Sequence, residues 1–164
     1  MTPKEYTYAY DKFMMEDDVY YVSEHRGSYD NDSELSDIVI DNCDIVLFPI
    51  SITRFEAEKA RVKLDDKGIK ASVFHQLWIK PFNIKGQWLT TTKRSKYGGL
   101  VLDDDYQDGV SKSIAHKLMI KTGKNIHTLG LDDKTAGFYD KVDNLPPNAD
   151  KIVRKVLEII QSMK

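Results

Sequence analysis

The alternation of short apolar runs with helix-like stretches beyond residue 37 is the feature that most constrains the fold. Apolar runs that favour strands occupy residues 44–50, 71–79, 99–103 and 126–131. The stretches that favour helices occupy residues 53–67, 83–95, 110–122 and 149–163. Strands joined by helices of this length favour right-handed crossovers and a parallel sheet covered on both faces. The sequence therefore predicts an α/β fold, a three-layer α/β/α sandwich with a mostly parallel sheet.

The helix ends carry recognisable signals. Thr53 followed by Glu56 has the spacing of a capping box, and Gly68 stands where a helix commonly ends in a left-handed residue. Gly123 is placed in the same way after residues 110–122. The last helix has a broad apolar face that must dock on the rest of the domain, formed by Ile152, Val153, Val156, Leu157, Ile159 and Ile160.

The first 36 residues differ in composition from the rest of the chain. Thr2 and Pro3 favour a helix over residues 2–15, and residues 19–22 are rich in strand-forming side chains. Residues 27–36 are dense in Asp, Asn, Ser and Gly, which marks a linker. We therefore expect two units, residues 1–36 and residues 37–164.

Charge and cysteine content narrow the possible partners and compartment. The 164 residues include 24 Lys and Arg, 26 Asp and Glu and a single cysteine, Cys43. Without a basic run there is no sequence signal for nucleic acid, and no apolar run approaches the length of a membrane span. One cysteine cannot form an internal disulfide, so we expect a cytoplasmic protein.

No sequence signature of a catalytic centre or metal site is found, so we expect neither in this chain. It has no phosphate-binding glycine loop, no nucleophile elbow and no histidine pair at metal spacing. His25 and Arg26 follow the expected strand at 19–22, where α/β folds bind ligands, and Arg26 beside Gly27 could hold a phosphate or carboxylate. The alternative is a surface arginine paired with Glu24 or Asp30.

Two further groups admit two interpretations each. Residues 103–105 are three consecutive aspartates that could bind Mg²⁺ or Ca²⁺, but neighbouring side chains point in different directions, which favours a turn before the next helix. Trp78 and Trp88 could pack in the core or at a subunit or domain interface, where tryptophan is common. We expect the interface.

The order of these segments resembles the C-terminal domain of transketolase-like thiamine-diphosphate enzymes, most closely the beta subunit of 2-oxoacid dehydrogenase first components. The resemblance covers nearly the whole chain and is carried by residues 19–29, 44–48, 56–60, 67–71, 74–82, 102–105, 109–111 and 126–133. Two departures are residues 49–51, where the family often has glycine, and residues 103–105, where glutamate is more frequent.

The resemblance implies that residues 37–164 form an assembly and substrate-entrance domain that is inactive alone, and that residues 1–36 are the tail of a pyrimidine-binding domain plus a linker. Thiamine diphosphate and magnesium would be held in the parent assembly by a cofactor-binding domain or subunit, and the chain would form a homo- or hetero-oligomer. By position, Arg26 and His25 match a contact to the substrate anion in some relatives. The alternative is a free-standing interaction or anion-binding module on the same scaffold. A third possibility is a ferredoxin-linked 2-oxoacid oxidoreductase, whose iron-sulfur cluster would belong to another chain.

Overall fold

A four-stranded parallel sheet forms the centre of the protein, seen here in a computed structural model that describes residues 1–135 and 144–163. Its strands are β1 (Ile45–Pro49), β2 (Ala71–Val73), β3 (Gly99–Tyr106) and β4 (Ile126–Leu131). They lie in the order β2-β1-β3-β4, and each neighbouring pair is parallel. The predicted α/β fold is confirmed.

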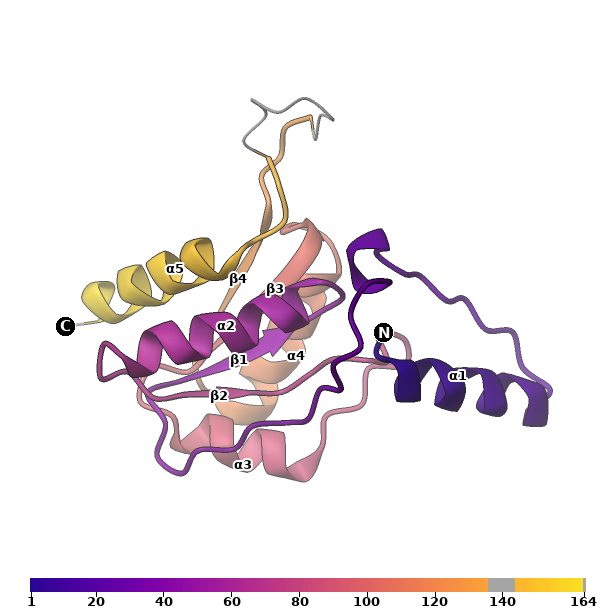
Figure 1. The fold of residues 1–164 in the computed structure, drawn as a ribbon. Coiled ribbons are helices and arrows are strands. Elements are labelled where there is room, and N and C mark those ends of the chain that lie inside the picture. The colour runs from indigo at the N-terminus through magenta and orange to yellow at the C-terminus, as the bar shows by residue number, and fades with distance from the viewer. Residues whose placement is uncertain (136–143, 164) are drawn as a thin grey trace.

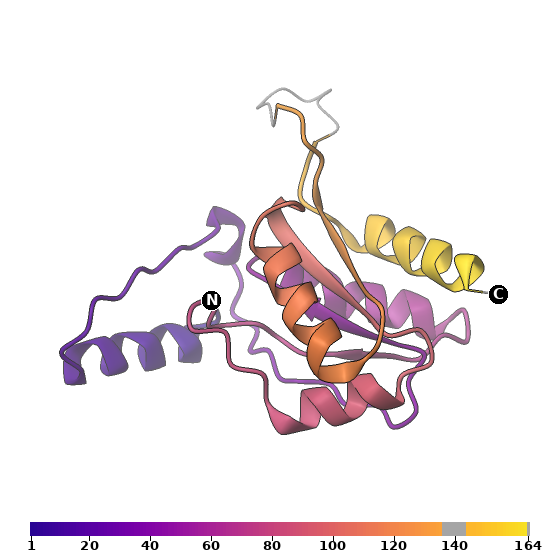
Figure 2. The ribbon, with the colours of Figure 1, turned by 180° about the vertical axis from the view of Figure 1, so that it is seen from behind.

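Helices cover both faces of this sheet (Figures 1 and 2). Helices α2 (Thr53–Asp65) and α5 (Ala149–Ser162) pack together on one face. Helices α3 (Gly86–Arg94) and α4 (Val110–Thr122) cover the other. The side chains of α5 that face the sheet are buried with Leu64, Leu100 and Leu102, so the predicted apolar face of the last helix does dock on the domain.

The ends of the helices are set partly by distant groups. Helix α2 begins at Thr53 itself, whose hydroxyl donates to the carbonyl oxygen of Ile50 at 2.6 Å, so the predicted capping box is wrong. The Glu56 carboxylate instead accepts the backbone N–H of Ala149 at 2.8 Å and caps α5. Gly68 and Gly123 adopt the left-handed conformation predicted for them, with φ of 73° and 68°.

The first part of the segment before β1 extends away from the sheet (Figure 1), whereas Ile38 already pairs with Val73 of β2 in an antiparallel bridge. It begins with α1 (Pro3–Met15), whose cap is a complete capping box formed by Thr2 and Glu5. The 3₁₀ turn η1 (Arg26–Ser28) interrupts the connection to β1. The predicted strand at residues 19–22 is wrong: Val19 and Tyr21 are 101% and 93% exposed, and none of the described strands lies beside them to accept their hydrogen bonds.

Strand β2 is shorter than predicted because its backbone finds other partners. Phe74 N–H still donates to Leu47 O at 2.9 Å, but His75 N–H donates to the Asp37 carboxylate at 2.9 Å. Only a single bridge, between Gln76 and Ile50, continues the pairing. Residues 74–79 therefore leave the sheet and pass over its carboxyl edge.

Within the described residues, no helix is long and apolar enough to span a bilayer.

Candidate functional site

The strand order places a crevice at the carboxyl ends of β1 and β3. The chain leaves β1 for β2 on one side and then crosses to β3 on the other, and ligands of open α/β sheets bind where connections diverge in this way. A pocket of about 280 Å³ lies here. Its walls come from the ends of β1 and β3, the starts of α2 and α4, and the residues Ser23, Glu24, His25, Ser28, Gln76, Leu77 and Ile79.

Ser51 and Asp104 join the two sides of this crevice. Ser51 adopts a left-handed backbone conformation, with φ of 54°, that turns the chain sharply after β1. Its hydroxyl donates to Asp104 Oδ2 at 2.6 Å. The hydrogen bond fixes the mouth of the pocket between the two strand ends.

Asp103 is the buried member of the acidic run. It is only 4% exposed, its Oδ1 accepts the N–H of Asp105 at 3.2 Å, and burial raises its pKa above the ordinary value. Among the residues that the structure describes, no three acidic, histidine or cysteine side chains are grouped to hold a metal ion. Residues 103–105 line the pocket and give it an acidic wall.

Of the two residues predicted to bind an anion, only His25 lines the pocket. Its Nδ1 accepts the N–H of Gly27 at 3.0 Å, which caps η1. Arg26 is exposed and is not among the residues that line the pocket. Within the described part of the chain the Arg26 side chain forms no ion pair, so the predicted alternative of pairing with Glu24 or Asp30 is not observed.

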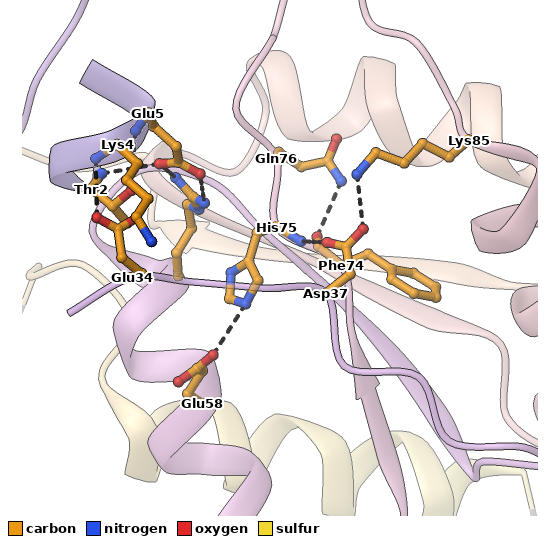
Figure 3. A network of polar contacts seen from close by, with 11 residues as sticks. Thr2, Lys4, Glu5, Glu34, Asp37, Glu58, Phe74, His75, Gln76 and Lys85 are labelled. Atoms are coloured by element: carbon orange, nitrogen blue, oxygen red, sulfur yellow. Dashed lines mark hydrogen bonds and ion pairs between the residues drawn. The ribbon is translucent and has the colours of Figure 1, made fainter. Parts of the chain in front are cut away.

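A buried ion pair holds α1 against the domain next to this pocket (Figure 3). Arg54, 3% exposed on the first turn of α2, donates from Nη1 and Nη2 to the two oxygens of Glu5 at 2.8 and 2.5 Å. Burial alone would raise the pKa of Glu5, but the hydrogen bonds and charge of Arg54 outweigh it and hold this pKa below its ordinary value. Such a bidentate pair is both strong and directional.

His75 lies beside this ion pair and is held neutral. Burial, followed by the positive charge of Arg54, lowers the pKa of His75 from 6.5 to about 4. Its Nε2 lies 3.3 Å from Glu58 Oε1 but forms no hydrogen bond with it (Figure 3). Burial also raises the pKa of Glu58, so low pH would protonate that carboxylate before the imidazole.

Asp37 organises the other side of the network. It accepts the backbone N–H of His75 and the Lys85 ammonium, both at 2.9 Å (Figure 3), and it also accepts Trp88 Nε1–H at 2.8 Å. The sequence does not indicate the roles of Asp37 and Arg54, because each forms its contacts with residues about 40 or more positions away. No local spacing signals such partners.

The two tryptophans occupy different environments. Trp88 is 3% exposed and packs against Phe48 and Phe74 in the core, so it has almost no surface to offer a partner. Trp78 is half-buried and lies edge-on to Tyr8 and Tyr20, with ring centres 6.3 and 6.0 Å apart. Trp78 therefore packs between residues 1–36 and the rest of the domain.

Comparison with known proteins gives similarity at the level of structure alone. No model of a protein family matches the sequence, and no curated protein matches it. A structure described as a split gene transketolase, inactive beta4 tetramer, matches with a TM-score of 0.63 and 18% identity. It is matched over 76% of this chain and 40% of its own.

A second similar structure is 2-oxoglutarate:ferredoxin oxidoreductase from Magnetococcus marinus with 2-oxoglutarate, coenzyme A and succinyl-CoA bound. It matches with a TM-score of 0.55 and 19% identity over 75% of this chain and 19% of its own. The chain thus spans less than half the length of either structure. Its fold is that of a transketolase-like C-terminal domain.

Proposed function

We propose that the chain is the C-terminal assembly and substrate-entrance domain of a thiamine-diphosphate-dependent enzyme, either a 2-oxoacid dehydrogenase beta subunit or a transketolase-like enzyme. The observation that carries the proposal is the shared fold with a split gene transketolase, of which this chain spans only 40%. A domain of this size would complete an active centre whose reactive groups lie on another domain or subunit. A cytoplasmic location is part of the proposal, since the one cysteine, Cys43, is buried and free.

The pocket of this chain does not fit the cofactor. Glu24 and residues 103–105 line it with carboxylates, which would repel a diphosphate. Arg54, a cation in its wall, is already paired with Glu5. We therefore place thiamine diphosphate and its magnesium on the partner.

Residues 1–36 would be the last part of the neighbouring pyrimidine-binding domain. The extended residues 19–22 have unpaired backbone groups and exposed apolar side chains, which suits addition to the edge of a partner's sheet. Trp78, packed on Tyr8 and Tyr20, would then lie at the domain interface.

Reconstitution tests this function. The chain would be mixed with the polypeptide encoded beside it, thiamine diphosphate and magnesium, and decarboxylation of 2-oxoacids such as pyruvate and 2-oxoglutarate would be measured. Turnover should require both polypeptides. Turnover by this chain alone would refute the proposal, and a stable complex without turnover would favour the alternative of a non-catalytic interaction module.

Arg26 and His25 are proposed as contacts to the substrate anion in that assembly. Arg26→Ala should raise KM for a 2-oxoacid about tenfold or more, because a charged hydrogen bond contributes about 1.5–3 kcal/mol, while stability stays unchanged at this exposed position. Lys67→Ala, another exposed cation far from the pocket, is the matched control. Equal KM values for the two variants would remove Arg26 from the site.

A further inference from the structure

Basic residues are concentrated in two stretches of the chain. Of the 24 Lys and Arg, nine lie in residues 79–98 and 110–125, which contain no Asp or Glu. The remaining fifteen are mixed with all 26 acidic residues. The linear sequence shows no basic run, yet this distribution is strongly asymmetric.

The fold brings both stretches to one surface. They form α3, α4 and their flanking residues, and the two helices pack beside each other on one face of the sheet (Figure 2). Eight of the nine side chains are exposed. Among the described residues, six of these eight form no ion pair with a carboxylate, and together they define the basic face: Lys80, Lys93, Arg94, Lys96, Lys117 and Lys121.

The same chain carries a segment of opposite character. Residues 1–36, which we call the N-terminal arm, contain nine acidic and three basic residues. The arm also exposes apolar side chains, with Met15 at 86%, Val19 at 101% and Tyr21 at 93%. A surface that is both acidic and apolar gains from docking through charge and through burial.

The arm is anchored away from the basic face of its own domain. Glu5 is bound by Arg54 on α2, and α2 covers the face of the sheet opposite to α3 and α4. In both views α1 extends outward from the domain (Figures 1 and 2). The arm is thus presented to another molecule, while the basic face is left open.

From this complementarity we propose that the basic face docks the N-terminal arm of a second copy of the chain. Two copies related by a twofold axis would exchange arms, so that each acidic arm covers the other's basic face. This association concerns the chain by itself, and a partner that takes up residues 19–22 in the proposed enzyme would replace the second copy there. A chain that proves monomeric would leave the reconstitution experiment unaffected.

Salt provides the first test. Electrostatic attraction acts over about 10 Å at 0.1 M salt and about 3 Å at 1 M. Light scattering coupled to size-exclusion chromatography should show twice the 18.9 kDa chain mass at about 0.05 M salt and the single-chain mass at about 1 M. A mass of 18.9 kDa at both concentrations would overturn the proposal.

Charge reversal provides the second test. Lys93→Glu with Arg94→Glu should make the protein monomeric at low salt, and so should Asp17→Lys with Asp18→Lys in the arm. An equimolar mixture of the two variants should associate again, because each reversed surface then meets its opposite. Circular dichroism would verify that both variants are folded.

Two controls make the outcome decisive. Lys117→Glu with Lys121→Glu reverses the basic face on α4 instead of α3 and should act in the same way. Lys67→Glu with Lys70→Glu changes the net charge equally on exposed positions outside that face and should leave the association intact. No recovery on mixing, or an equal effect of this last control, would overturn the proposal, as would a chain that stays monomeric but binds RNA or anionic vesicles.

Discussion

Lowering the pH should destabilise this protein through His75 in particular. The pKa of its imidazole is 6.5 when exposed and about 4 in the fold, because the ring is buried beside Arg54. Between these two values the unfolded chain binds a proton that the folded chain does not. The stability contributed by neutral His75 is therefore complete above pH 6.5 and is lost as the pH falls toward 4.

The size of the effect follows from the difference in pKa. One pKa unit corresponds to about 1.4 kcal/mol, so the full shift amounts to a loss of about 3 kcal/mol in the free energy of unfolding. This is a large share of the 5–15 kcal/mol typical of small domains. Glu58 acts in the opposite direction, because its raised pKa makes the folded state bind protons more tightly as the pH falls.

A variant isolates the contribution of His75 from those of other groups. Urea unfolding of the wild type and of His75→Gln would be followed by tryptophan fluorescence between about pH 7 and pH 4. The stability of the wild type relative to the variant should fall by about 3 kcal/mol across this range. Parallel curves would refute the reasoning, and His116→Gln, at an exposed position on α4, should behave as the wild type does.

Two further changes test the anchoring of α1 and the strand connections. Glu5→Gln should cost about 3 kcal/mol, because it leaves the buried guanidinium of Arg54 without a charged partner, and limited proteolysis should then cleave residues 1–36 first. Gly98→Ala should destabilise the fold far more than Gly68→Ala in thermal unfolding. Both glycines have positive φ, but a Cβ on Gly98 would lie 2.0 Å from Asn125 O, whereas a Cβ on Gly68 has nothing within 4 Å.

The elements that could be predicted from the sequence are those whose signals are local. Helix α4 runs from Val110 to Thr122 and ends at Gly123 as expected, because apolar spacing and a left-handed glycine act within a few residues. Strand β4 likewise has the bounds expected from its apolar run. The three-layer fold then follows from the alternation of such elements.

What could not be predicted depends on partners distant in the sequence. Residues 19–22 have strand-forming side chains, but a strand also needs a neighbour, and the described part of the chain places none there. Asp37 binds Trp88 and Lys85, and Arg54 binds Glu5, across 48 to 51 positions. The basic face arises in the same way, since its two stretches come together only when α3 and α4 pack.

The hydrogen bond between Glu56 and the first N–H of α5 has a consequence for how the protein is made. Helix α5 is the last of the described elements to leave the ribosome, yet it packs beside α2, whose Glu56 lies 93 residues earlier. Until Ile152, Val156 and Ile159 emerge, Leu64 and Leu100 remain open to solvent. During synthesis the nascent chain therefore exposes the apolar side chains of this face that α2 alone does not cover, and a chain cut short before α5 would leave them permanently uncovered.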